Sequence, residues 1–196
     1  MTPPRRACRK ALLSCAVAGM LLGTAGCQSS MRGSATDRES KYSLKKRNSY
    51  ISCLSEKGSA PLTCRLPLKV SNHSLKSLLD SIEESLGTRY RPGGTGPDGY
   101  DCSGYTSYLY KKHFRMLLPR TSGEQALLGS TVPRQELQAG DLVFFSMGGR
   151  AIDHVGIFLD RNSFAHSSNS GVKISDLGTG YYSQHYILGS RIISPD

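Results

Sequence analysis

The stretch Asp101-Cys102-Ser103-Gly104 decides how this chain is interpreted. It follows a loop rich in glycine and proline (92–99) and precedes a segment, 105–114, that is predicted to be helical. A cysteine at such a junction meets unpaired backbone N–H groups and the positive end of the helix dipole. Both favour the thiolate, which is the nucleophilic form of cysteine. We therefore expect Cys102 to be a reactive thiol.

Two histidines downstream fall on adjacent predicted strands, 154–160 and 163–168. If these strands form a hairpin, His154 and His166 share a face and lie within reach of each other. His154 would then accept the proton of Cys102, and His166 would hydrogen-bond to the far ring nitrogen of His154 and fix its tautomer. The remaining histidines are interpreted as ordinary core or surface residues: His73, His113 and His185.

The hydrophobic pattern changes its period around these residues. Before Cys102, apolar residues recur at helical spacing behind a predicted N-cap at Ser74, with Gly87 past the helix end: Leu75, Leu78, Leu79, Ile82 and Leu86. After Gly140, a short apolar run at 142–145 is predicted to be a buried strand, with further strands at 172–175 and 187–193. Helices followed by antiparallel strands indicate the α+β class.

The first 26 residues have the layout of a secretory signal peptide. A basic stretch (5–10) precedes an apolar run (11–22) and four small residues (23–26), and the run is shorter than the ~20 residues that span a bilayer. The small residues just before Cys27 resemble a bacterial lipobox. That resemblance implies cleavage before Cys27 and lipidation of its thiol. The alternative is an ordinary signal peptide followed by an incidental cysteine.

The mature chain would keep a positive charge. The formal net charge of +10 falls to +6 when the signal peptide, with its four basic residues, is removed. Such an excess suits an anionic partner, and both an anionic lipid surface and the carboxylate-rich peptide of a cell wall are compatible with it. Simple solubility is the other explanation. Nucleic acid is not an expected partner of an exported chain.

Residues 27–49 are rich in serine, arginine, lysine and glycine and are predicted to form a flexible tether. Residues 50–73 form a small extension ahead of a catalytic domain at 74–196. In an exported chain, Cys53 and Cys64 of this extension are predicted to form a disulfide. Closing a loop of that size would stabilise the fold by about 2–3 kcal/mol. The alternative is a pair of unrelated thiols.

From about residue 75 onward, the chain resembles the NlpC/P60 family of cell-wall cysteine peptidases. The resemblance covers roughly 120 residues. It rests on six ordered blocks: Thr88-Arg89-Tyr90-Arg91-Pro92-Gly93-Gly94, Asp101-Cys102-Ser103-Gly104, Leu118-Pro119-Arg120-Thr121-Ser122, Ala139-Gly140-Asp141-Leu142-Val143-Phe144-Phe145, His154-Val155-Gly156-Ile157-Phe158 and Phe164-Ala165-His166. With the lipobox, the chain is most similar to murein endopeptidases that are lipid-anchored to the outer membrane.

The resemblance implies a papain-like fold, in which a helical part carrying the nucleophile packs on an antiparallel sheet that carries the histidines. It implies Cys102 as nucleophile, His154 as base and His166 as the third member of the triad. Tyr90 matches a tyrosine whose hydroxyl lies near the cysteine and helps to stabilise the oxyanion. No metal and no cofactor are expected, and we expect a monomer.

Two more residues near the nucleophile are candidates for substrate contact. Arg120 could bind a substrate carboxylate or could pin the loop after Pro119. Ser103 borders the nucleophile, and helix capping is its simpler interpretation, as it is for Asp101.

The implied activity is cleavage of stem-peptide amide bonds in peptidoglycan through a thioester. The D-Ala to diaminopimelate cross-link is the favoured bond. The alternatives are a D-Glu to diaminopimelate peptidase, an amidase on the same scaffold, and a catalytically silent wall-binding lipoprotein. The periplasmic face of the outer membrane is the expected location.

Overall fold

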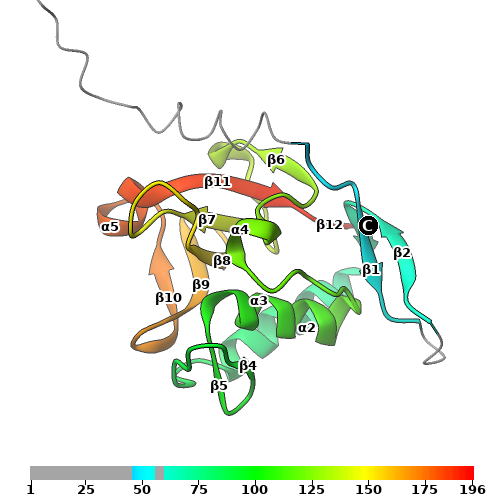
Figure 1. Ribbon diagram of the computed structural model, residues 1–196, viewed down its shortest axis with the longest axis horizontal. Helices are drawn as coiled ribbons and strands as arrows, with labels where there is room; N and C mark the ends of the chain where they lie inside the picture. Colours follow the sequence, from blue (N-terminus) through cyan, green and yellow to red (C-terminus); the bar gives the residue numbers. More distant parts are fainter. Residues whose placement is uncertain (1–45, 56–59) are drawn as a thin grey trace, which may run out of the picture. The chain divides into compact units, whose positions relative to one another are not determined.

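The computed structural model describes residues 46–55 and 60–196, so the predicted signal peptide and Cys27 lie outside the described residues. A six-stranded antiparallel sheet with the order β10-β9-β8-β7-β11-β6 forms the centre of the domain (Figure 1). Its strands are β6 (Ser130–Val132), β7 (Leu142–Phe145), β8 (His154–Phe158), β9 (Ser163–Ser168), β10 (Gly171–Asp176) and β11 (Tyr186–Arg191). With the helices described next, this sheet confirms the expected α+β fold.

Two helices, α2 (Asn72–Glu84) and α3 (Cys102–Phe114), cover one face of the sheet (Figure 1). The helix α2 begins earlier than predicted, because the Ser71 side chain caps it by accepting from the backbone N–H of Ser74 at 3.1 Å. The predicted N-cap, Ser74, is therefore inside the first turn. Leu86 lies beyond the last turn and is 44% exposed, so it does not belong to the buried stripe.

The central strands are buried on both faces. On the helix side, Phe144, Val155 and Ile157 pack with residues of α2 and α3 such as Leu78 and Tyr105. On the other side lies a smaller cluster that α5 (Gly180–His185) helps to cover: Val143, Phe145, Phe158, Phe164 and Leu177. Burial on both faces explains why 142–145 is a continuous apolar run instead of an alternating one.

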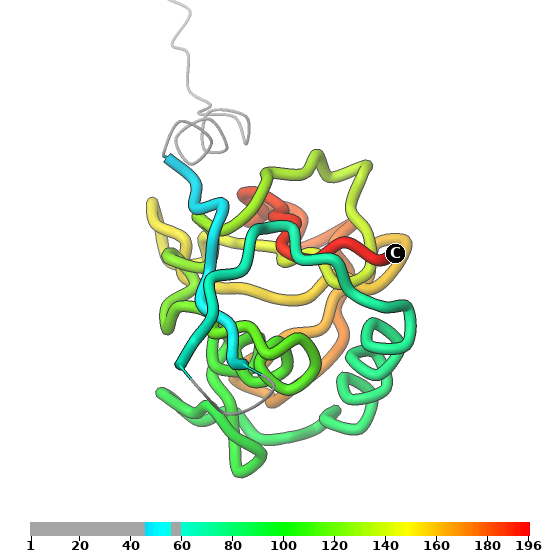
Figure 2. Tube along the Cα trace, turned by 90° about the vertical axis from the view of Figure 1, so that its right-hand side faces the viewer, coloured from blue at the N-terminus to red at the C-terminus, as the bar shows by residue number. Residues whose placement is uncertain are grey.

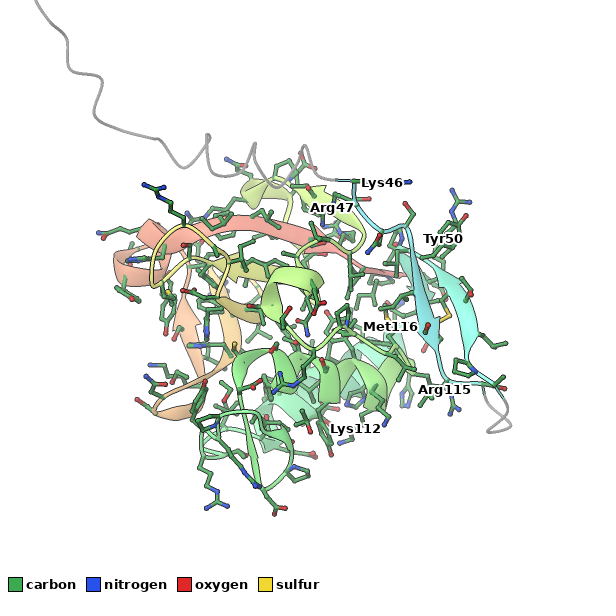
Figure 3. All side chains as sticks on the ribbon, viewed as in Figure 1. Lys46, Arg47, Tyr50, Lys112, Arg115 and Met116 are labelled. Carbon is green, nitrogen blue, oxygen red and sulfur yellow. A yellow bond between two sulfur atoms is a disulfide. The ribbon has the colours of Figure 1, made fainter. Side chains whose placement is uncertain are left out.

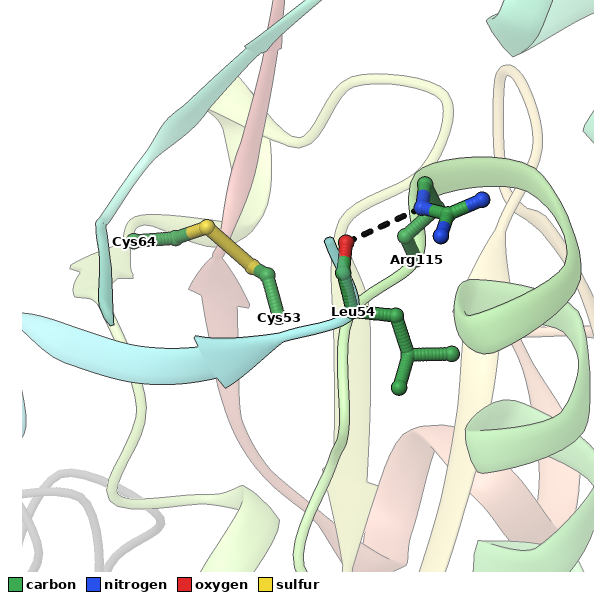
Figure 4. Close-up of a disulfide and its surroundings, with 4 residues drawn as sticks. All are labelled: Cys53, Leu54, Cys64 and Arg115. Atoms are coloured by element: carbon green, nitrogen blue, oxygen red, sulfur yellow. Dashed lines mark hydrogen bonds between the residues drawn. A yellow bond between two sulfur atoms is a disulfide. The ribbon is translucent and has the colours of Figure 1, made fainter. Parts of the chain in front are cut away.

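The extension forms a hairpin of β1 (Tyr50–Cys53) and β2 (Leu62–Arg65), which the Cys53–Cys64 disulfide crosses (Figure 4). Next, β3 (Leu68–Val70) pairs in parallel with the last strand, β12 (Ile193–Pro195). Figure 2 shows this segment running across the domain to reach the C-terminal strand. The extension is therefore part of the framework of the domain.

The hairpin is also joined to the end of the helix that carries Cys102. The backbone N–H of Leu54 donates to the carbonyl of Arg115 at 2.8 Å. The Arg115 side chain donates back to the carbonyl of Leu54 (Figure 4) and also to that of Ser55. The Leu54 bond satisfies a carbonyl where α3 ends, which is where a helix has unpaired carbonyls, and the side-chain bonds satisfy two carbonyls just after β1.

Arg47 falls within the range 27–49 that is predicted to be the tether, and it contacts the domain. The Arg47 guanidinium donates to the carbonyl of Leu128 at 2.6 Å, to the carbonyl of Gly129 at 2.8 Å and to the hydroxyl of Ser190 at 2.7 Å. Arg47 thereby attaches the start of the described chain to the β6–β11 edge of the sheet (Figure 3). The part of the predicted tether that the structure describes is therefore attached to the domain through Arg47.

Short elements complete the description: β4 (Thr95–Gly96), β5 (Gly99–Tyr100), α4 (Ser122–Gln125) and a 3-10 turn at Arg134–Glu136. In the described part of the chain, none of the helices has the length and apolar character needed to cross a membrane.

Candidate active site

Asp101 holds the start of the helix that carries the candidate nucleophile. Its carboxylate accepts from the backbone N–H of Gly104 at 2.7 Å, as an N-cap does, and from the backbone N–H of Gly93 at 3.0 Å. Gly104 has to be glycine here, because a Cβ at this position would lie 2.0 Å from the Gly94 carbonyl oxygen. The loop is thus packed directly on the first turn, and the position of Cys102 is fixed.

The surroundings of the Cys102 thiol differ from the sequence-based expectation. Burial and the neighbouring Asp101 carboxylate raise the pKa of the thiol, while the backbone N–H groups of Val155, Ser103 and Cys102 itself act to lower it. The raising effects are larger, so the resting side chain is a neutral thiol. It donates to the backbone carbonyl of Asp153 at a sulfur–oxygen distance of 3.8 Å. Such a thiol needs a base to become a nucleophile.

His154 and His166 lie side by side on the sheet. The antiparallel register pairs Ile157 with Ala165 and Phe158 with Phe164, which places the two histidines on the same face. Nε2 of His154 and Nδ1 of His166 are 2.8 Å apart, within hydrogen-bonding distance. The predicted hairpin and its parity are therefore confirmed.

A third group continues this chain of hydrogen bonds. Nε2 of His166 lies 2.9 Å from the hydroxyl oxygen of Ser175 on β10. Because His166 occupies Nε2 of His154, Nδ1 of His154 is the ring nitrogen left to accept a proton. His154 must then carry its own hydrogen on Nε2, and His166 must carry its hydrogen on the nitrogen that faces Ser175. Sequence reasoning missed Ser175.

Both imidazoles are held in the neutral form. Burial lowers the pKa of His154 to about 4, a trend that the Lys173 charge reinforces and the Asp153 charge opposes. Burial also lowers the pKa of His166 to about 3, with further contributions from His154 and Lys173. A neutral imidazole is the form that can accept a proton from a neutral thiol.

These shifts predict the acid limb of the pH profile. If His154 is the base, kcat/KM is expected to stay near its maximum down to about pH 5 and to fall as the pH drops through about 4, because imidazolium cannot accept a proton. Initial rates on a stem-peptide substrate between about pH 3 and 8 would measure this. An acid limb centred near the ordinary histidine value of about 6.5 would contradict it.

The same shifts require a control for stability. The unfolded chain, whose histidines have pKa values near 6.5, binds more protons than the folded chain between about pH 4 and 6.5. The free energy of unfolding therefore decreases as the pH is lowered through that window. Circular dichroism at each pH would identify the conditions in which the protein is folded, and only the rates measured in those conditions would be compared.

Three of the candidate residues, Cys102, His154 and Tyr90, line one cleft of about 350 Å³, whereas His166, Ser103 and Arg120 do not line it. Cys102 and Tyr90 line one side, and His154 lines the side formed by the sheet. The other lining residues are Met147, Asp153, Ser167, Ser168, Asn169, Ser170, Lys173, Tyr181 and Tyr182. A nucleophile and its base thus face one space that a peptide chain could enter. Within residues 46–55 and 60–196, no cluster of histidine, cysteine and acidic side chains is arranged to hold a metal ion.

The model of the NlpC/P60 family matches residues 87–191, which include Cys102, His154 and His166. The chain belongs to the NlpC/P60 family. A curated relative, the Murein DD-endopeptidase MepS/Murein LD-carboxypeptidase of Escherichia coli K12, is 39% identical over 127 residues, covering 64% of this chain and 67% of that protein. The Murein DD-endopeptidase MepH of Escherichia coli K12 is 35% identical over 158 residues, covering 76% of this chain and 58% of that protein. Such relatives support hydrolase activity.

Solved structures of NlpC/P60 proteins share the fold. A family member from Bacillus cereus superposes with a TM-score of 0.59 at 28% identity, covering 77% of this chain and 53% of that chain. The NlpC/P60 domain of the peptidoglycan hydrolase SagA superposes with a TM-score of 0.51 at 26% identity, covering 59% of this chain and 97% of that chain. Both comparisons place the chain on the NlpC/P60 fold.

Arg120 and Ser103 of this NlpC/P60 domain hold the nucleophile's loop together. Both terminal nitrogens of the Arg120 guanidinium donate to the Asp101 carboxylate, and one also donates to the Ser103 hydroxyl at 3.0 Å. The Ser103 hydroxyl in turn donates to Asp101 at 3.3 Å. Because these partners occupy Arg120, the geometry favours the loop-pinning role over carboxylate binding, and Ser103 supports the cap of α3.

Proposed function

We propose that this protein is a peptidoglycan-hydrolysing cysteine endopeptidase that cleaves the D-Ala to diaminopimelate cross-link between stem peptides. The observation that carries the proposal is that Cys102 and His154 line one cleft, while the buried His166 lies 2.8 Å from His154 behind it. The names of the murein endopeptidase relatives support the choice of substrate.

The reaction would begin with proton transfer from the Cys102 thiol to Nδ1 of His154. The sulfur attacks the carbonyl carbon of the scissile amide, and the resulting imidazolium is stabilised by His166. His154 then returns the proton to the leaving amine as the C–N bond breaks, which leaves a thioester on Cys102. Water, deprotonated by His154, attacks the thioester and releases the acid and the thiol.

Tyr90 would stabilise the negative charge that develops on the carbonyl oxygen. It lines the cleft beside Cys102, and burial together with the charges of Cys102 and Asp101 raises the pKa of its hydroxyl, so the hydroxyl remains a hydrogen-bond donor. The backbone N–H of Cys102 is the natural second donor.

Replacing Tyr90 by phenylalanine is expected to lower kcat about a hundredfold with little change in KM, since an oxyanion donor acts mainly in the transition state. Steady-state kinetics on a cross-linked dimer of stem peptides would measure both constants. An unchanged kcat would remove Tyr90 from the oxyanion site.

The function is tested by digestion of purified murein with the chain from residue 46 onward and with its Cys102→Ala variant, followed by mass analysis of the fragments. We expect the wild type to convert cross-linked dimers to monomers and the variant to leave them intact. Release of whole stem peptides would identify an amidase, and cuts between D-Glu and diaminopimelate would identify the other peptidase. No release by the wild type at any pH under reducing conditions would support the silent wall-binding alternative.

We also propose that the chain is lipid-anchored through Cys27 at the periplasmic face of the outer membrane. The basic, apolar and small-residue layout before Cys27 supports this location. Expression of the full chain in a Gram-negative host, next to a Cys27→Ser variant, tests it. A wild type that is soluble in the periplasm and has an unmodified N-terminal mass would contradict the anchor.

A further inference from the structure

Lys173 lies on the catalytic face of the sheet, on the strand beyond the triad. In the register of β9 and β10, Lys173 is directly opposite His166, and Ser175, two residues further along, bonds to the same histidine. Residues two apart on a strand share a face. Lys173 also lines the cleft that contains Cys102 and His154. Lys173 therefore borders the space where the substrate would bind.

This charge has no counter-ion in the described part of the chain. Asp153, the one acidic residue that lines the cleft, already accepts from the backbone N–H groups of Met147 at 2.8 Å and Gly148 at 2.7 Å. The Lys173 ammonium group makes no ion pair and no hydrogen bond within residues 46–55 and 60–196. Arg120, the cation that the sequence singled out for a carboxylate, is occupied by Asp101. Lys173 is thus the free cation among the described residues of the cleft.

An uncompensated cation beside the triad is unfavourable for catalysis by itself. The charge of Lys173 lowers the pKa of both His154 and His166, so it opposes the imidazolium that forms when the thiol is deprotonated. An anion bound at Lys173 would neutralise this opposition. A negatively charged substrate bound at Lys173 would therefore stabilise the imidazolium that forms during catalysis.

We propose that Lys173 is a specificity residue that binds a free carboxylate of the stem peptide adjacent to the scissile bond. The proposal rests on the proposed function for the identity of the substrate. A carboxylate is an anionic group that stem peptides carry, and an ammonium group on a flexible stem can meet it as a point charge. The bound carboxylate strengthens binding and also offsets the repulsion between Lys173 and the imidazolium.

Two synthetic cross-linked peptides test the proposal. They are identical except that the free α-carboxylate of the diaminopimelate residue at the scissile bond is a carboxamide in the second. At about pH 8, where histidines are neutral in every variant, the wild type is expected to prefer the carboxylate about tenfold or more in kcat/KM. Lys173→Met should lose this preference, Lys173→Arg should retain most of it, and Lys111→Met, a lysine outside the cleft, should leave it unchanged.

A binding measurement separates this proposal from the proposed function. Titration calorimetry of both peptides with the Cys102→Ala protein does not need hydrolysis, and the same measurement is repeated with Lys173→Met in that background. Tighter binding of the carboxylate peptide that disappears with Lys173→Met supports the role of Lys173, even if the wild type proves inactive. Equal binding of the two peptides, or a preference that survives Lys173→Met, overturns it.

Discussion

Replacing His154 by alanine is expected to lower kcat/KM for murein cross-links by about ten thousandfold or more, the scale on which a triad member acts. The reason is the state of the thiol. Burial and Asp101 raise the pKa of Cys102, so little thiolate exists without a base. An enzyme whose cysteine was already a thiolate would lose less activity when the histidine is removed. The loss should appear in kcat, because the imidazole acts during bond making and breaking, and initial rates on a cross-linked dimer would measure it.

The matched control is His73→Ala, which removes an exposed imidazole from the first turn of α2. This variant is expected to keep full activity, and near-ultraviolet circular dichroism should show the same fold for both variants. If His154→Ala retained more than about a tenth of the wild-type kcat/KM, the assignment of His154 as the base would be wrong.

Replacing Arg191 by methionine is expected to destabilise the domain by about 3–5 kcal/mol. The Asp141 side chain is 2% exposed, and Arg191 donates to its two oxygens at 3.0 and 2.8 Å. Removing the guanidinium leaves a buried carboxylate with one remaining donor, the backbone N–H of Gln138 at 2.8 Å. Removing one partner of a buried pair costs much more than the intact pair contributes, because the other charge stays desolvated.

Urea denaturation of the chain from residue 46 onward, with the disulfide intact, would measure this loss. Lys76→Met is the matched control, since the Lys76–Asp80 pair on α2 has side chains that are 72% and 51% exposed. Its removal should leave the free energy of unfolding nearly unchanged, because water screens an exposed pair. Equal, small effects of the two substitutions would show that the Asp141–Arg191 pair is not a buried electrostatic contact in solution.

The sequence was informative where local chemistry and parity decide the structure. The loop before Cys102 and its acidic cap specify a helix start. The alternation around His154 and His166 places both histidines on one face of the sheet, and a shift of the strand register by two residues would keep them there. The protonation state of Cys102 could not be foreseen, because desolvation depends on the surrounding packing. The contribution of the helix start was expected to dominate, and burial proved larger.

Other parts of the site depend on contacts between distant segments. Lys173 and Ser175 are two residues apart in the predicted strand at 172–175, so the sequence places them on one face of that strand. Only the pairing with β9 shows that this is the face that carries His166. The two roles considered for Arg120 could not be separated until its distance to Asp101 was known. The start of α2 was misplaced because both Ser71 and Ser74 are good N-caps, and the parallel pairing of β3 with β12 favours the earlier one.

The attachment of Arg47 has a mechanical consequence. A force applied to the chain at Lys46 would reach the domain at the β6–β11 edge, through the carbonyls and the hydroxyl that Arg47 binds. In the sheet order, β6 and β10 are the two outermost strands, and His166 lies on β9, next to β10. Tension from the N-terminal side would therefore act first at the β6–β11 edge, which β7 separates from the two strands that carry His154 and His166.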